Sequence, residues 1–283
     1  MLLVTLMWSS AGVVTRQLEA ARGFEITFWR SSFNALALVF ILGVMRGRAL
    51  LPSLKGRAVW ASGGCWAVMF TAFMVALSLT TVANVLVTMS LGPLLTALFA
   101  RVFLRQHIPA CTWAAIVVAG VGIAWMFGQQ ASAGGSLGGV AVALGVPLAA
   151  AANWCLLQNM GQQSRTDMLP AVLLGALMSA GFALPLAWPL QSGAHDLGLL
   201  AFLGVFQLAV PCLLAVRLTR ELPGHELALL GLAETLAGVL WAWAFAGEHP
   251  GSAALIGGSL VLLALVANEM LAPPSVKSDP TNA

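Results

Sequence analysis

LAETLAGVLWAWAFAGE, residues 232–248, places one acid, Glu234, inside a run of leucine, alanine, glycine and tryptophan, and ends at a second acid, Glu248. Only 8% of the 283 residues are charged, whereas soluble domains carry about 25%. Because 60% of the residues are hydrophobic, water cannot be the main solvent of this chain. The stretch therefore belongs to a segment that crosses a lipid bilayer, with Glu234 at depth.

The other apolar runs are also long, and they lack the alternation of apolar and polar residues that is typical of β-barrel strands. A helix needs about 20 apolar residues to cross a hydrocarbon core of about 30 Å. We therefore predict an all-α integral membrane protein with ten transmembrane helices. The predicted spans are residues 1–18, 25–45, 58–79, 82–104, 109–127, 136–158, 168–190, 197–216, 226–246 and 251–271.

Basic residues gather on one side of the predicted spans. Ten of the thirteen fall in alternate loops or in the tail: Arg46, Arg48, Lys55, Arg57, Arg101, Arg105, Arg165, Arg217, Arg220 and Lys277. The opposite side has only Arg16 and Arg22, while Arg30 lies inside the second span. By the positive-inside rule, both termini are expected in the cytoplasm of a multi-pass protein in the bacterial inner membrane.

The opening stretch has an echo 142 positions earlier, SLGPLLTALFARVFLRQ at residues 90–106. Four apolar positions recur between the two: Leu94, Leu98, Ala100 and Phe103 return as Leu236, Leu240, Ala242 and Phe245. A unit of five spans crosses the membrane an odd number of times, so two copies face opposite ways, as in many secondary transporters. We predict inverted repeats at 1–130 and 131–272 around a central cavity, and a disordered cytoplasmic tail at 273–283.

The two stretches resemble the EamA family of the drug/metabolite transporter superfamily. The matching motifs are Gly92-Pro93 to Leu104-Arg105-Gln106, Glu234-Thr235 to Ala246-Gly247-Glu248, Trp8-Ser9-Ser10 and Arg30. Arg105-Gln106 stands where the family has Gly-Glu, and Thr235 where it has Pro. The resemblance, which is strongest to amino-acid exporters of the YddG type, implies a ten-helix basket that exports metabolites from the cytoplasm.

Glu234, Gly238 and Trp241 are spaced to share one helix face with Phe245. An acid, a gap and two rings predict a groove for a ligand with an amine and an apolar body. The alternative is that Glu234 is a structural hydrogen-bond partner between helices. For Arg30 the alternatives are snorkelling to the outer headgroups and a role in an outer gate or in helix packing. About 10 Å of depth separates Arg30 from Glu234, which argues against a direct ion pair.

Neutral polar and aromatic residues of other spans complete the predicted substrate site. Its members are Trp8, Ser10, Asn34, Thr71, Ser78, Asn84, Thr88, Asn153, Trp154, Gln158, Gln207, Glu234 and Trp241. Pro93 and Pro211 each remove a helical hydrogen bond, so with Arg30 they are predicted to kink or gate the helices. Any single amide or hydroxyl of this set could instead join two helices. Together they suit small zwitterionic solutes better than ions.

The sequence contains no phosphate-binding loop and no complete zinc-protease or serine-protease motif. We therefore predict no enzyme activity, no catalytic residues, no cofactor and no metal. The predicted function is secondary export of small metabolites, above all aromatic and other neutral amino acids, by alternating access. A channel-like facilitator and a multidrug, cation or nucleobase exporter remain alternatives. The expected partners are a small-molecule substrate and membrane lipid, without nucleic acid, for a monomeric chain that is either proton-coupled or a uniporter.

Overall fold

The computed structural model describes residues 2–105, 107–132, 137–159, 168–218 and 224–271. Every regular element in these ranges is a helix, as the continuous apolar runs predicted. The predicted tail at 273–283, the basic residues Arg165, Arg220 and Lys277, and the side chain of Arg217 lie outside the described residues.

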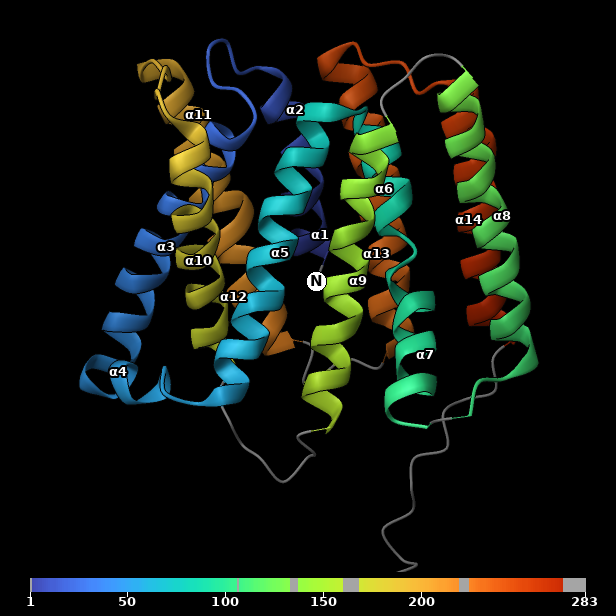
Figure 1. The fold of residues 1–283 in the computed structure, drawn as a ribbon, viewed down its shortest axis with the longest axis horizontal. Coiled ribbons are helices and arrows are strands. Elements are labelled where there is room, and N and C mark those ends of the chain that lie inside the picture. Colours follow the sequence, from blue (N-terminus) through green and yellow to red (C-terminus); the bar gives the residue numbers. More distant parts are fainter. Residues whose placement is uncertain (1, 106, 133–136, 160–167, 219–223, 272–283) are drawn as a thin grey trace, which may run out of the picture.

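The helices run roughly parallel to one another, with their connections at two opposite ends (Figure 1). In chain order the elements are α1 (Leu2–Ser9), α2 (Ala11–Arg16), α3 (Phe24–Arg46), the 3-10 turn η1 (Gly47–Ala49), α4 (Leu50–Ser53), α5 (Arg57–Leu79), α6 (Val82–Met89), α7 (Gly92–Phe103), α8 (Ala110–Ser132), α9 (Leu137–Asn159), α10 (Leu169–Ala187), α11 (Ala194–Gly204), the π-turn η2 (Val205–Ala209), α12 (Val210–Leu218), α13 (Gly224–Ala246) and α14 (Ser252–Leu271). We call the end with α2 the upper end and the end with α4 the lower end (Figure 1).

Eight segments of the described chain are long and apolar enough to cross a bilayer, which supports a multi-pass membrane protein. They are Phe24–Ser53, Arg57–Leu79, Val82–Phe103, Ala110–Gln129, Leu137–Leu157, Leu169–Ala187, Ala194–Ala215 and Ser252–Leu271. Ala233–Ala246 of α13 is a shorter apolar helix, and the α1–α2 pair occupies the place of the first predicted span. The number ten therefore stays a prediction.

The segment from Val82 to Phe103 is broken into two helices beside Pro93. Because Pro93 has no N–H group, it cannot donate to the carbonyl of Met89, and α6 ends there before α7 begins at Gly92. The Ser90 hydroxyl donates to the carbonyl of Val87 at 2.7 Å, which satisfies one backbone group next to the break. The interruption leaves irregular backbone in the middle of an otherwise membrane-length segment.

A second irregularity precedes Pro211. The five residues Val205–Ala209 form a π-turn between α11 and α12. Pro211 cannot donate to the carbonyl of Gln207, so the ordinary hydrogen-bond pattern fails at this point. Wider turns of this kind redirect side chains and often occur at functional sites. Gln207 lies inside the turn.

α8 and α14 lie side by side over much of their length (Figure 1). They approach closely at Gly122 and Gly257, where an added Cβ on Gly122 would lie 2.7 Å from the carbonyl oxygen of Gly257. Glycine at both positions lets the two backbones touch, which is the usual way for helices to associate in lipid.

Arg16, the last residue of α2, joins several helices at the upper end. Its Nε lies 2.8 Å from Glu248 Oε2, just beyond α13. Its other two nitrogens donate to the carbonyls of Leu77 and Thr80 at the end of α5, at 2.9 and 2.7 Å. Glu248 Oε1 accepts from the backbone N–H of Val82 in α6 at 2.6 Å. One ion pair thus ties α2, α5, α6 and the end of α13 together.

A reciprocal pair of carboxylates joins α3 to α11 at the same end. Glu25 in the first turn of α3 accepts backbone hydrogen bonds from Gln191 and Ser192 at 2.7 and 2.8 Å. Asp196 in the first turn of α11 accepts three from residues 19–21, at 2.8 to 2.9 Å. Each helix therefore fixes the loop that leads into the other, and hydrogen bonds to charged acceptors are the stronger kind.

Two residues with positive φ lie 142 positions apart in the sequence, each shortly after a helix. Gly247 after α13 has a φ of 64°, and Arg105 after α7 has a φ of 55°. Glycine adopts this left-handed region freely, whereas a side chain there is strained. Positive φ therefore recurs at corresponding places, with arginine at one and glycine at the other.

Candidate functional site

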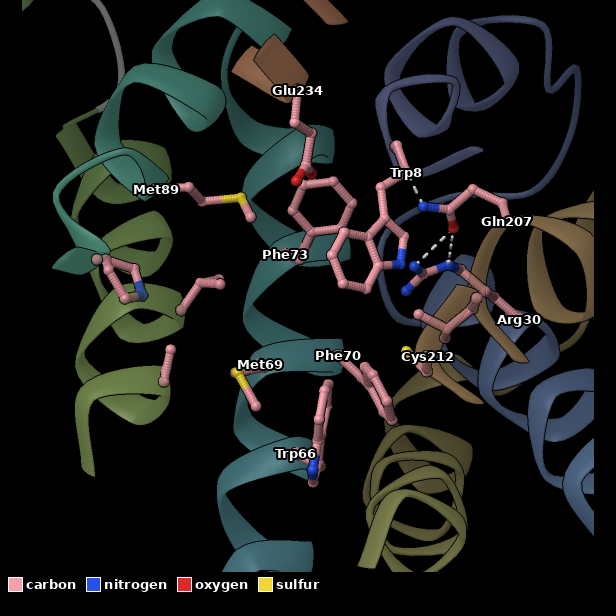
Figure 2. A pocket seen from close by; sticks show the side chains of 15 residues that line it. Trp8, Arg30, Trp66, Met69, Phe70, Phe73, Met89, Gln207, Cys212 and Glu234 are labelled. Carbon is pink, nitrogen blue, oxygen red and sulfur yellow. Dashed lines mark hydrogen bonds between the residues drawn. The ribbon is translucent and has the colours of Figure 1, made fainter. Parts of the chain in front are cut away.

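A cavity of about 230 Å³ lies among the helices in the middle of the bundle (Figure 2). Its lining consists of Trp8, Arg30, Trp66, Met69, Phe70, Phe73, Met89, Gly92, Val146, Pro147, Ala150, Gln207, Leu208, Cys212 and Glu234. These residues come from α1, α3, α5, α6, α7, α9, η2, α12 and α13. The wall is mostly aromatic, aliphatic and sulfur-containing, and its charged or amide side chains are Arg30, Gln207 and Glu234.

Arg30 is held in this wall by burial, by an aromatic ring and by two hydrogen bonds. Only 2% of its surface is exposed, and Phe73 places its ring centroid 5.7 Å from the guanidinium carbon. Arg30 Nη2 and Nε donate to Gln207 Oε1 at 2.8 and 3.3 Å, and Gln207 Nε2 donates to the carbonyl of Trp8 at 3.2 Å. The snorkelling alternative for Arg30 is therefore wrong, because the guanidinium is enclosed by protein instead of reaching the headgroups.

Two polar groups of this region remain without a described partner. Arg30 Nη1 is buried and makes no hydrogen bond to any described residue. The carboxylate of Glu234 points into the cavity from α13 (Figure 2). Within the described part of the chain, no hydrogen bond or ion pair of Glu234 is found, so the proposed tie to a neighbouring helix has no partner there.

The predicted groove along α13 does not form. Gly238 packs against Leu86 of α6 and the backbone of Ser9, so the space beside Glu234 is filled. Trp241 donates its ring N–H to Ser9 Oγ at 3.2 Å and does not line the cavity. Phe245 is 65% exposed on the outside of the bundle. The aromatic wall near Glu234 comes from other helices.

Phe73, Phe70 and Trp66 supply that wall from α5, together with Met69. Their positions follow the helical spacing of three and four residues, so they share one face. The prediction from sequence missed this stripe, although the pattern was readable in residues 66–73.

Several other predicted residues join helices instead of lining the cavity. Thr71 Oγ1 lies 2.9 Å from Ser179 Oγ, which lies 3.0 Å from Ser31 Oγ, so three hydroxyls link α5, α10 and α3. Asn153 of α9 accepts a hydrogen bond from Ser62 of α5 at 2.6 Å. These contacts fit the alternative in which polar groups hold spans together.

The remaining predicted residues also lie away from the cavity lining. Ser78 and Thr88 donate their hydroxyls to carbonyls of their own helices, at Val75 and Asn84, and Ser10 donates to the carbonyl of Met7 in the preceding α1. Asn84 donates to Thr80 Oγ1, Asn34 is fully buried without a described side-chain partner, and Trp154 is exposed. Pro93 and Pro211 flank the lining residues Gly92 and Cys212. The side chain of Gln158 lies outside the described residues.

No group of three His, Cys, Asp or Glu side chains within the described ranges is placed to bind a metal ion. Of the residues predicted for the site, the structure brings four to one cavity: Trp8, Arg30, Gln207 and Glu234.

The model of the EamA-like transporter family matches this chain twice, over residues 1–128 and 137–268. The chain belongs to the EamA family. As an EamA protein it is a membrane transporter of the drug/metabolite superfamily, as the two motif stretches predicted. The family match also divides the chain into two units of similar length.

Comparison with solved structures agrees on the fold of this EamA chain. One structure, titled "Crystal structure of protein", is 18% identical, with a TM-score of 0.66, and the match covers 95% of each chain. At this identity the likeness concerns the fold alone. No curated protein matches the chain.

Proposed function

We propose that this EamA-family chain exports small metabolites, above all aromatic and other neutral amino acids, by alternating access. The observation that carries the proposal is the cavity in which Arg30, Gln207 and Glu234 face an aromatic wall. By the helical rise, Arg30 lies about 9 Å below the upper start of α3 and Glu234 about 15 Å from the lower start of α13. Substrate sites of secondary transporters lie near the bilayer midplane, which is about 15 Å from either face of a hydrocarbon core of about 30 Å.

We also propose ten spans arranged as two inverted five-helix repeats. The double match of the family model supports two units. α8 packs against α14 and α3 against α10, so spans in corresponding places of the two units are neighbours. α8 runs from the lower to the upper end and α14 runs back (Figure 1), which supports opposite orientations. The left-handed turns at Arg105 and Gly247 fall at corresponding places as well.

The lower end is proposed to face the cytoplasm of a bacterial cell. The basic residues Arg46, Arg48, Lys55 and Arg57 lie at the lower ends of α3 and α5 or between them, and Arg101 and Arg105 lie at the lower end of α7 (Figure 1). Arg16 and Arg22 belong to the upper end. This segregation supports the orientation given by the positive-inside rule. The upper end, tied by Arg16 and Glu248, would then be the outer side.

The cavity suits a zwitterion with an apolar body. One guanidinium and one carboxylate are available for opposite charges, while rings and thioethers contact the apolar part. The broken backbone at Met89–Gly92 and the π-turn at Gln207 both border the cavity, as expected where a transporter site is built from interrupted helices.

Flux in proteoliposomes tests the proposal. The purified chain is reconstituted, and uptake of labelled phenylalanine, leucine, methionine, a purine and a lipophilic cation is measured, with single-channel recording in parallel. Saturable flux of an amino acid without unitary conductance is expected. Unitary currents would favour the channel-like facilitator. Flux of the purine or cation alone would favour a nucleobase or a cation exporter. The absence of flux for every solute would contradict transport of these classes of solute.

A further inference from the structure

Arg30 presents an unmatched charge inside the bundle. No ion pair joins its guanidinium to any acid among the described residues, and only 2% of its surface is exposed. Gln207 satisfies two of the guanidinium nitrogens, but a neutral amide supplies no counter-charge. Arginine keeps its proton in proteins. A buried, fully charged donor without an acid normally signals a missing anionic partner.

The hydrogen bonds around Arg30 fix which part of the guanidinium remains available. Gln207 Oε1 holds the edge formed by Nε and Nη2, and the Trp8 carbonyl holds Gln207. The ring of Phe73 limits movement on one side. Nη1 is then left as the nitrogen without a described partner, in a side chain that lines the cavity. An arginine that served only helix packing would be expected to have all its buried donors satisfied.

We infer that Arg30 Nη1 is an anion subsite, which takes the carboxylate of a cargo with an apolar body. The inference rests on the proposed transport function and names the chemistry of its site. Gln207 is a positioning residue, because it orients Arg30 without neutralising it. A glutamate at that place would pair permanently with Arg30 and compete with the cargo. Glu234, on the same wall, disfavours a second negative charge and so selects against dicarboxylates.

Matched ligand pairs can test the subsite by binding alone. Trp8 and Trp66 line the cavity, so quenching of tryptophan fluorescence in nanodiscs reports occupancy. The probes are hexanoate against hexanamide and leucine against leucinamide. Each acid is expected to bind about 10- to 100-fold more tightly than its amide, the factor for a hydrogen bond to a charged group.

The variants separate positioning from structure. Arg30→Gln is expected to reduce the acid-to-amide preference to about one, and Arg30→Lys to retain part of it, since lysine keeps the charge but loses the planar fork. Gln207→Leu should lower the preference by freeing the guanidinium. Gln207→Glu should abolish it, because the carboxylate still accepts from Arg30 and supplies a permanent counter-charge, while the hydrogen bond to the Trp8 carbonyl is lost. Arg48→Gln, an exposed arginine outside the cavity, is the control and should leave the preference unchanged.

Equal affinity of acids and amides in the wild type, or an unchanged preference in both Arg30→Gln and Gln207→Glu, would overturn the subsite. The absence of saturable quenching by all four probes would overturn it too. Failure of transport is distinguishable: acid-selective binding without flux would contradict the transport function and leave the subsite standing. Flux without any preference for a carboxylate would support the transport function and contradict the anion subsite.

Discussion

Arg16 and Glu248 lie 232 positions apart in the sequence and 2.8 Å apart in the structure, at the upper end of the bundle. Through this pair the end of α2 is joined to the end of α5 and the start of α6. The cavity begins below them, since Phe73 lies one turn below Leu77, whose carbonyl accepts from Arg16. The pair therefore joins these helices above the cavity, and we expect it to hold the cavity closed on the side that we propose to be outer.

Glu248→Gln should weaken this closure, because the amide can still accept from Val82 but carries no charge for Arg16. Cys212 lines the cavity and reports its accessibility when Cys65, Cys111 and Cys155 are replaced by alanine. In right-side-out vesicles, labelling of Cys212 by an impermeant thiol reagent is expected to become about five-fold faster, the factor for about 1 kcal/mol. Equal labelling rates in the two proteins would show that the pair does not hold the outer side closed.

Arg105→Gly should stabilise the protein by about 1 kcal/mol, because glycine removes the strain of a left-handed side chain. Arg105→Ala keeps the strain while removing the charge, so the difference between these two variants isolates the backbone effect. Gly247→Ala should have the opposite sign by a similar amount. Thermal unfolding in detergent measures the stability of all three variants. An Arg105→Gly protein less stable than the wild type would show that Arg105 is not strained.

Gly257→Ala should destabilise the packing of α8 and α14 by about 1–3 kcal/mol. An added Cβ would lie 2.5 Å from the carbonyl oxygen of Gly122, which belongs to backbone and cannot rotate away. Gly120→Ala is the matched control, since nothing lies within 4 Å of its added Cβ. Unfolding of both variants in the same detergent gives the comparison, and similar stabilities would exclude a tight crossing at these glycines.

The helices were largely predictable from the sequence because lipid imposes length and hydropathy on every span. Broken backbone was also expected near Pro93 and Pro211, since a missing N–H is a local property. The ends of long-range contacts were not predictable: nothing in a single sequence indicates that Glu248 reaches Arg16, or that Asp196 reaches the loop before α3.

The site was harder to predict because helical spacing gives a face but does not say which neighbour covers it. Glu234 and Trp241 share a face of α13, yet Gly238 between them admits Leu86 and closes the groove. Thr71 and Asn153 looked like ligand contacts, and their hydrogen bonds join helices. The signal for Trp66 and Phe73 was the aromatic stripe of α5, whose residues recur at helical spacing.

Glu234→Gln should lower the flux of a zwitterionic cargo about ten-fold or more, because the amide cannot pair with an ammonium group. If Glu234 also carries the coupling proton, the variant will lose any response of flux to an imposed proton gradient. Glu19→Gln, whose side chain is exposed at the upper end, is the control. Wild-type flux and an unchanged response to the gradient would make Glu234 a structural residue.

Cargo passage through the cavity can be tested most directly by one measurement on the chain with Cys212 as its single cysteine. An impermeant thiol reagent is applied from either side of oriented vesicles, with and without a saturating amino-acid cargo. Alternating access predicts that Cys212 reacts from both sides, and that cargo slows both reactions. A Cys212 that reacts from one side only, or at a rate that saturating cargo leaves unchanged, would contradict an alternating-access site in this cavity.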